Sequence, residues 1–88
     1  MQDLPVKSSD LDIEILFIGA SGSKVEKLQE KLKELELYLG PIDGLFGQGV
    51  EMAVKEFQEG QGLAADGIAG VSTLTALGLI TLEPESMP

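Results

Sequence analysis

Residues 43–47 read Asp43-Gly44-Leu45-Phe46-Gly47, and the related stretch Asp66-Gly67-Ile68-Ala69-Gly70 begins 23 positions later. A glycine accepts a positive φ, where a Cβ would clash, and an aspartate before it accepts hydrogen bonds from main-chain amides two or three residues on. A segment with helical spacing of apolar residues follows each stretch. The pattern predicts two tight loops, each leading into a helix.

The two copies also match beyond the loops, because Ala53 and Ala76 occupy the same place in the repeat. Small residues there allow close helix packing. We expect Phe46 to fill the core, and we expect Leu45 and Ile68 to point inward. The two copies should pack as related halves.

The segment before the first loop predicts a helix over residues 24–39. Ser23 and Glu26 have the spacing of a capping box, and Gly40-Pro41 is a stop signal. Lysines and glutamates occupy the outer faces, which we interpret as solvated. The apolar residues recur at spacings of 3, 4, 3 and 4, as one helix face requires: Val25, Leu28, Leu32, Leu35 and Leu39.

The second predicted helix covers about residues 48–59 and ends at Gly60 and Gly62. Its core face is Val50, Ala53, Val54 and Phe57. A third, short helix follows the second loop, with Ser72 or Thr73 as its cap and with Leu74, Ala76 and Leu77. The predicted fold class is therefore all-α: a three-helix bundle with two Asp-Gly loop-helix repeats, in which the first helix covers the other two.

The ends of the chain differ from this region. Within residues 11–18, positions 11, 13, 15 and 17 are apolar and positions 12 and 14 are acidic. This period of two predicts a short extended segment laid across the helices and anchored by Leu16 and Ile18. We expect a flexible arm over 1–15, a domain over 16–80 and a polar tail over 81–88. The start has no features of a signal peptide, which leaves open a cytosolic protein or a piece of a longer one.

The composition excludes several functions. The 88 residues carry a net charge of −9, which disfavours nucleic acid and anionic membrane surfaces as partners. Because the chain contains no Cys and no His, it lacks disulfides, thiol nucleophiles and the commonest metal ligands. Neither Asp-Gly loop has the ligand spacing of an EF-hand. We expect no cofactor and no metal.

A carboxylate pair can hydrolyse a glycoside, which makes Asp43 and Asp66 candidate catalysts. An aspartate that precedes glycine at a helix entrance is usually a turn former. The hydroxyl residues near the loops have no accompanying base, which makes them caps rather than nucleophiles. We predict no catalytic residues.

The combined motifs resemble the peptidoglycan-binding-like domain family. Its opening is similar to Leu16-x-x-Gly19-x-x-Gly22-x-x-Val25-x-x-Leu28-Gln29. The similarity continues through Ile42–Gly47, Ala53–Gln58 and Gly62–Thr73, so that it covers about residues 16–79. One departure is Val50, where the family usually has Thr; the second loop keeps its Thr, at Thr73.

This resemblance implies a non-catalytic, three-helix module that holds cell-wall enzymes on peptidoglycan at the cell envelope, either periplasmic or extracellular. Peptidoglycan, through its glycan or its stem peptide, is then the expected partner. An apolar platform with amide and hydroxyl groups suits such a ligand. Alternatively, Gln58 and Gln61 are exposed helix-end residues and Tyr38 borders the core. The candidate binding residues are Tyr38, Asp43, Gln48, Gln58, Gln61 and Asp66.

The alternative function is an acidic protein-protein interaction module on the same scaffold, with no peptidoglycan binding. An acidic face would suit a basic partner, and the arm at 11–18 could pair or swap. We expect a monomer.

Overall fold

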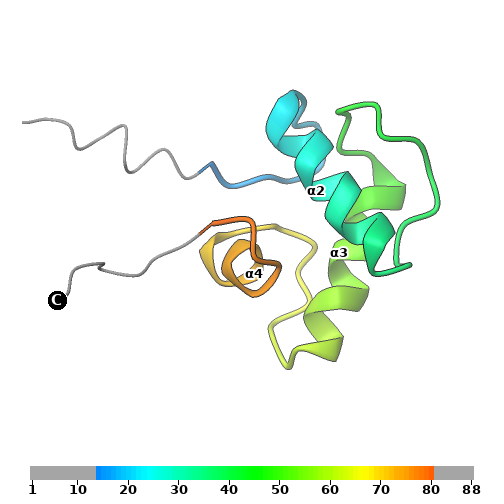
Figure 1. Cartoon of the computed structure of the whole chain (residues 1–88). Helices are drawn as coiled ribbons and strands as arrows, with labels where there is room; N and C mark the ends of the chain where they lie inside the picture. Colours follow the sequence, from blue (N-terminus) through cyan, green and yellow to red (C-terminus); the bar gives the residue numbers. More distant parts are fainter. Residues whose placement is uncertain (1–13, 81–88) are drawn as a thin grey trace, which may run out of the picture.

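The computed structural model describes residues 14–80, which form the helices α2 (Ser23–Glu34), α3 (Gln48–Gly60) and α4 (Val71–Ala76). Helix α2 packs against α3, and α4 lies beside them near the end of the described chain (Figure 1). The all-α prediction is therefore confirmed for this region. The arm up to residue 13 and the tail from residue 81 lie outside the described residues.

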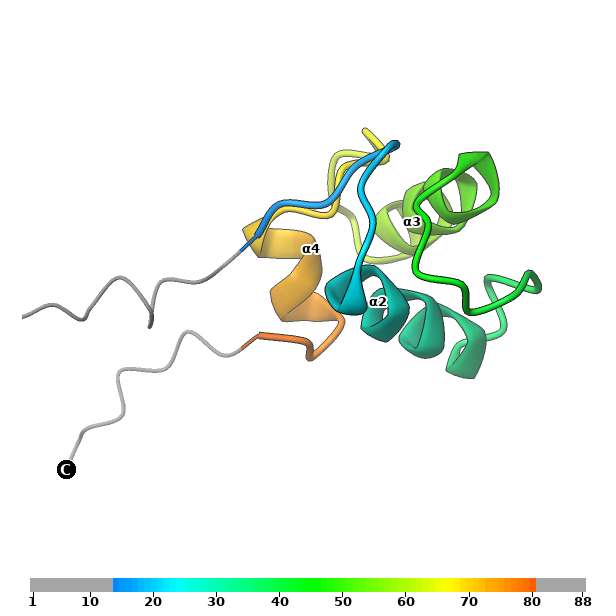
Figure 2. The same cartoon turned by 90° about the horizontal axis from the view of Figure 1, so that it is seen from above.

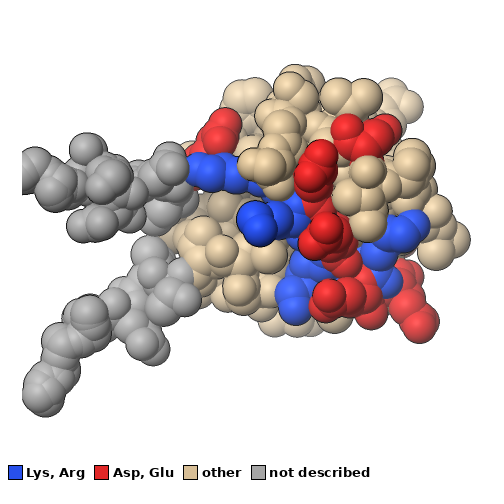
Figure 3. Space-filling view, turned by 45° about the horizontal axis from the view of Figure 1, so that its top comes forward, with Lys and Arg blue, Asp and Glu red and all other residues tan. Residues whose placement is uncertain are grey.

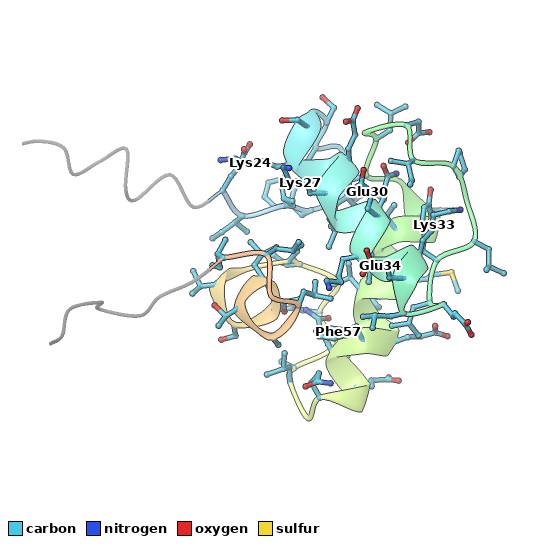
Figure 4. All side chains as sticks on the ribbon, viewed as in Figure 1. Lys24, Lys27, Glu30, Lys33, Glu34 and Phe57 are labelled. Atoms are coloured by element: carbon cyan, nitrogen blue, oxygen red, sulfur yellow. The ribbon has the colours of Figure 1, made fainter. Side chains whose placement is uncertain are left out.

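One apolar core joins the three helices and the segments between them. Phe57 points from α3 toward α2 (Figure 4), and the predicted core face of α3 is buried throughout. Phe46 is buried, as predicted. The remaining buried apolar residues include Leu16, Val25, Leu28, Leu32, Tyr38, Ala69, Leu74 and Leu77.

Two inward-pointing predictions, for Leu45 and Ile68, and one helix-packing prediction, for Ala76, are wrong. Leu45 is 58% exposed and Ile68 is 41% exposed. Their carbonyl oxygens instead accept hydrogen bonds from the buried Gln29 and Gln58 side chains. Their N–H groups donate to the carboxylate of the aspartate two positions earlier in each loop. The next residue of each loop, Phe46 or Ala69, then turns its side chain inward. Ala76 is exposed as well, whereas Ala53 is buried.

All three helices end in the same hydrogen-bonding pattern, the Schellman motif. After α3, Leu63 N donates to Gln58 O at 2.8 Å and Gly62 has φ = 76°. After α4, Leu79 N donates to Leu74 O at 2.9 Å and Gly78 has φ = 80°. The glycines therefore end these two helices because each takes the left-handed conformation that the motif needs.

Helix α2 ends earlier than predicted, at Glu34 rather than near residue 39. Leu37 N donates to Leu32 O at 2.9 Å, and Glu36 takes the left-handed place with φ = 63°. The predicted stop at Gly40 is therefore wrong. The apolar stripe fails beyond this point, and Leu39 is 88% exposed. A stop at a glutamate is hard to predict because non-glycine residues rarely adopt this conformation.

The predicted side-chain caps are also absent from the described helices. The N-caps are Gly22, Gly47 and Gly70, and none of them has a side chain to donate or accept. Ser23 lies inside α2, so the capping-box prediction is wrong. Thr73 lies inside α4, where its hydroxyl is used in a different contact.

The segment before α2 runs along both loops (Figure 2). Leu16 pairs with Ala69 through two main-chain hydrogen bonds of 3.1 and 2.8 Å, and Ser21 bridges to Leu45. Leu16 is buried, which confirms it as an anchor, whereas Ile18 is exposed and is not one. The segment thus ties the first loop to the second.

The surface of α2 carries mixed charges. Lys24, Lys27, Glu30 and Glu34 lie along its outer side (Figure 4), and acidic and basic groups alternate there (Figure 3). Lys24 forms an ion pair with Glu14, and Lys31 forms one with Glu34. Within residues 14–80 no helix is long and apolar enough to cross a membrane.

Candidate functional site

The side chain of Gln58 organises the second loop. It lies on α3, is 1% exposed, and accepts a hydrogen bond from Gly67 N at 2.9 Å. Its Nε2 donates to Asp66 Oδ1 at 3.0 Å and to Ile68 O at 2.9 Å. One buried amide therefore satisfies the inward-facing polar groups of the whole turn.

Gln29 does the same for the first loop from α2. It is fully buried and accepts a hydrogen bond from Gly44 N at 2.8 Å. Its Nε2 donates to Asp43 Oδ1 at 2.9 Å and to Leu45 O at 3.1 Å. The repeated unit is therefore larger than a loop and its following helix: it begins with a helix whose glutamine holds the loop.

The two aspartates are turn acceptors, as predicted. Leu45 N donates to Asp43 Oδ1 at 3.0 Å, and Ile68 N donates to Asp66 Oδ1 at 2.9 Å. The hydrogen bonds from Gln29 and then Leu45 lower the pKa of Asp43. Those from Ile68 and then Gln58 lower the pKa of Asp66. A general acid needs a raised pKa, so this environment opposes catalysis by either group.

The two loops differ at one buried position. Thr73 Oγ1 lies 3.0 Å from Gln58 Nε2 and is a third acceptor for its two amide hydrogens, which the three acceptors share. At the equivalent place the first repeat has Val50, which is buried and has no hydroxyl. The Gln29 amide instead lies 3.4 Å from the Tyr38 hydroxyl. In the first repeat, the Tyr38 hydroxyl therefore takes the place near the glutamine amide that the threonine hydroxyl takes in the second repeat.

A hollow of about 270 Å³ opens beside the second loop. Its polar side is formed by Gln58, Asp66, Ser72 and Thr73. Its apolar side is formed by Ile15, Leu63 and Ile68, together with Ala64. Two of the six predicted site residues, Gln58 and Asp66, therefore meet at one hollow, which we name the second-loop hollow.

A shallower hollow of about 450 Å³ lies between the segment after α2 and helix α3. Its lining includes Tyr38, Leu39 and Met52, with Glu56 as the only charged member. The Tyr38 hydroxyl donates to Pro41 O at 2.8 Å, so this side chain closes the edge of the core. We name this surface the Tyr38 hollow.

The other three predicted site residues line neither the second-loop hollow nor the Tyr38 hollow. Asp43 is exposed on the first loop and reaches Tyr38 only through Gln29. Gln48 and Gln61 are exposed at opposite ends of α3 and line none of the three hollows. For Gln58, the alternative of an exposed helix-end residue is wrong, because its amide is buried.

Sequence reasoning missed Gln29 as a functional counterpart of Gln58. The signal was present in the dipeptides Leu28-Gln29 and Phe57-Gln58. In each of them a core residue is followed by glutamine, in the helix that precedes an Asp-Gly loop. The offset between the glutamines is 29, whereas the loops are offset by 23, so a single alignment hides the match.

A third hollow of about 260 Å³ lies between α2 and α4. It has an apolar floor that includes Leu16, Leu74 and Ile80, and Lys24 and Lys27 line it with Glu14. In the part of the chain that the structure describes, no three acidic side chains gather into a metal-binding group.

Comparison with known proteins agrees with this geometry. The family described as "Putative peptidoglycan binding domain" matches residues 21–77, more than half of the chain and all of both glutamine-held loops. A spore cortex-lytic enzyme of Bacillus cereus is 49% identical over 55 residues, which are 62% of this chain and 21% of that protein. The N-acetylmuramoyl-L-alanine amidase CwlM of Mycobacterium tuberculosis is 45% identical over 56 residues, 64% of this chain and 14% of that protein.

Among solved structures, the SleB N-terminal domain superposes with a TM-score of 0.74 at 42% identity. The match covers 76% of this chain and 92% of that domain. The chain spans about a fifth of the length of the first curated relatives, so the similarity concerns one domain of each. On the extent of the family match, this chain belongs to the peptidoglycan-binding domain family.

Proposed function

We propose that this chain is a non-catalytic module that binds bacterial cell-wall peptidoglycan and holds an attached or partner cell-wall enzyme on it. The observation that carries the proposal is the family match over residues 21–77, which spans both glutamine-held loops. The relatives named above include a cortex-lytic enzyme and an amidase. The place of action is then the cell envelope, whether periplasmic or extracellular.

The second-loop hollow is the proposed contact surface. It combines apolar walls with an amide, a carboxylate and two hydroxyl-bearing residues, a mixture that suits a polymer of amide-linked groups. Its polar groups are held in place by Gln58, so little ordering is needed when a ligand binds. Asp66 and Gln58 are the proposed binding residues here, while Gln48 and Gln61 have a weaker case.

The test is co-sedimentation of the purified chain with insoluble peptidoglycan. We expect the chain to pellet at low salt, and we expect Ser72→Leu to weaken binding because the added side chain fills the second-loop hollow. The matched control is Thr75→Leu, an exposed residue of the same helix that does not line the hollow. A wild-type chain that stays in the supernatant would contradict the proposal.

A second candidate function, an acidic protein-interaction module, draws on the Tyr38 hollow. Leu39 is 88% exposed and Met52 is 65% exposed, an unusual pair of apolar side chains at one surface. A net charge of −9 favours a basic partner. Light scattering combined with partner capture tests this: the wild-type chain should capture a partner, and Leu39→Ser together with Met52→Ser should abolish the capture. A strict monomer that captures no protein partner would contradict this function.

A further inference from the structure

We propose that the second-loop hollow binds an aliphatic chain ending in a primary ammonium, with the Asp66 carboxylate as its counter-ion. In peptidoglycan this chemistry is supplied by the diamino acid of a stem peptide whose second amine is not cross-linked. The inference rests on the proposed function, because it names the part of the polymer that this hollow takes.

Charge favours a cation here. Among the described residues, Asp66 is the only charged one that lines the second-loop hollow, whereas two lysines line the hollow between α2 and α4. The whole chain carries −9, so its field attracts an ammonium rather than a carboxylate. Lys55 lies near Gly67, but within residues 14–80 no ion pair joins it to Asp66.

The carboxylate is also fixed in position. Its Oδ1 accepts from Gln58 Nε2 at 3.0 Å and from Ile68 N at 2.9 Å. The same two hydrogen bonds lower the pKa of Asp66, which keeps it ionised at neutral pH. By contrast, Glu56 in the Tyr38 hollow is an exposed helix residue without such restraints.

The size and lining of the hollow suit a small group with an aliphatic part. Its volume of about 270 Å³ falls just below the roughly 300–1,000 Å³ of pockets that enclose whole small-molecule ligands. Ile15, Leu63 and Ile68 offer apolar contact for methylene groups next to the carboxylate. None of its lining residues is aromatic, so it lacks the stacking platform that a sugar ring would use.

The experiment combines one protein change with one chemical change of the ligand. Asp66→Asn removes the charge but keeps an Oδ1 acceptor for Gln58 and Ile68, so the loop is preserved. Acetylating the free amines of purified sacculi removes the positive charge. We expect each change alone to weaken co-sedimentation about two- to fivefold, the range of an exposed ion pair. We expect the two together to weaken it no further, because they remove the same contact.

Glu59→Gln is the control, since it removes the same charge from an exposed position near the end of α3 that does not line this hollow. It should bind untreated sacculi like the wild type and lose binding on acetylation like the wild type. Thermal unfolding of both variants checks that they are folded.

Different outcomes separate the two claims. If untreated sacculi do not bind the wild-type chain, the proposed function fails. If they bind, but Asp66→Asn and acetylation have no effect or have additive effects, the ammonium assignment is overturned and the proposed function stands. Equal binding to glycan strands stripped of their peptides would also overturn the assignment, because it would place recognition on the sugar.

Discussion

Gln29 and Gln58 hold equivalent places in two helices and make the same contacts with two loops. Each amide accepts from the glycine N–H of an Asp-Gly turn and donates to the aspartate of that turn. Both side chains are buried, so water does not replace these hydrogen bonds. The fold is built around this pair of polar contacts as well as around its apolar core.

Truncation of either glutamine should be costly. Gln58→Ala leaves the buried Gly67 N–H without its partner and opens a cavity, and Gln29→Ala does the same at Gly44. We expect a loss of about 2–4 kcal/mol in the free energy of unfolding, measured by urea titration. The control Gln61→Ala, at an exposed site, should stay within about 0.5 kcal/mol of the wild type. Equal effects at all three positions would refute the buried contacts.

The contact between Gln58 and the Thr73 hydroxyl can be removed from the second repeat, and a hydroxyl can be introduced at the equivalent position of the first. Thr73→Val removes an acceptor of Gln58 and should lower stability by about 1 kcal/mol. Val50→Thr places a hydroxyl where Gln29 can donate to it, so we expect a change of less than about 1 kcal/mol. Chemical denaturation measures both. A much larger loss in Val50→Thr would show that the two glutamine sites are not equivalent.

The end of α2 offers a stabilising change. Glu36 has φ = 63°, in a place that glycine fills after α3 and α4. Glu36→Gly should raise the free energy of unfolding by about 0.5–1 kcal/mol, since the left-handed conformation costs a non-glycine residue roughly 1–2 kcal/mol and glycine loses part of this gain through its greater freedom when unfolded. The opposite change at the equivalent place after α3, Gly62→Ala, should lower the free energy of unfolding, because φ is 76° there. Since the added Cβ meets no other atom, this loss would come from the backbone conformation alone.

Acid should weaken the fold through the two aspartates. Hydrogen bonding lowers the pKa of Asp43 and of Asp66 below the usual 3.8, so the folded state favours their charged forms. Their contribution is present above the unfolded-state pKa and is lost as the pH falls through the lower folded-state pKa. Urea midpoints measured between pH 5 and pH 2 should therefore decline. A double Asp43→Asn and Asp66→Asn variant should decline less steeply, and an unchanged slope would count against this source.

Much of the fold could be predicted because it depends on local signals. The Asp-Gly turns, the positive φ of Gly44 and Gly67, and the buried face of α3 follow from residue type and spacing. The same local rules failed at Glu36, where neither composition nor periodicity marks a left-handed residue. They also failed at Leu45 and Ile68, where apolar type predicted burial but main-chain hydrogen bonds required the opposite orientation.

The candidate site was harder to predict. Asp66 and Gln58 could be proposed separately, but they are eight positions apart, and nothing in their spacing places one amide against one carboxylate. Gln29 was overlooked because glutamine in a charged helix is usually exposed, and its partner Asp43 lies 14 positions away. The second-loop hollow also needs Ile15, which reaches it only because Leu16 pairs with Ala69.

The sequence by itself therefore determined the loops, the helix content and the family, because turn chemistry and apolar periodicity act between near neighbours. Tertiary structure alone decided which glutamines are buried, which loop residues face outward and where a hollow forms. The physical reason is that a buried polar group must find a partner, and the partner of each loop is a glutamine of the helix that precedes it in the chain.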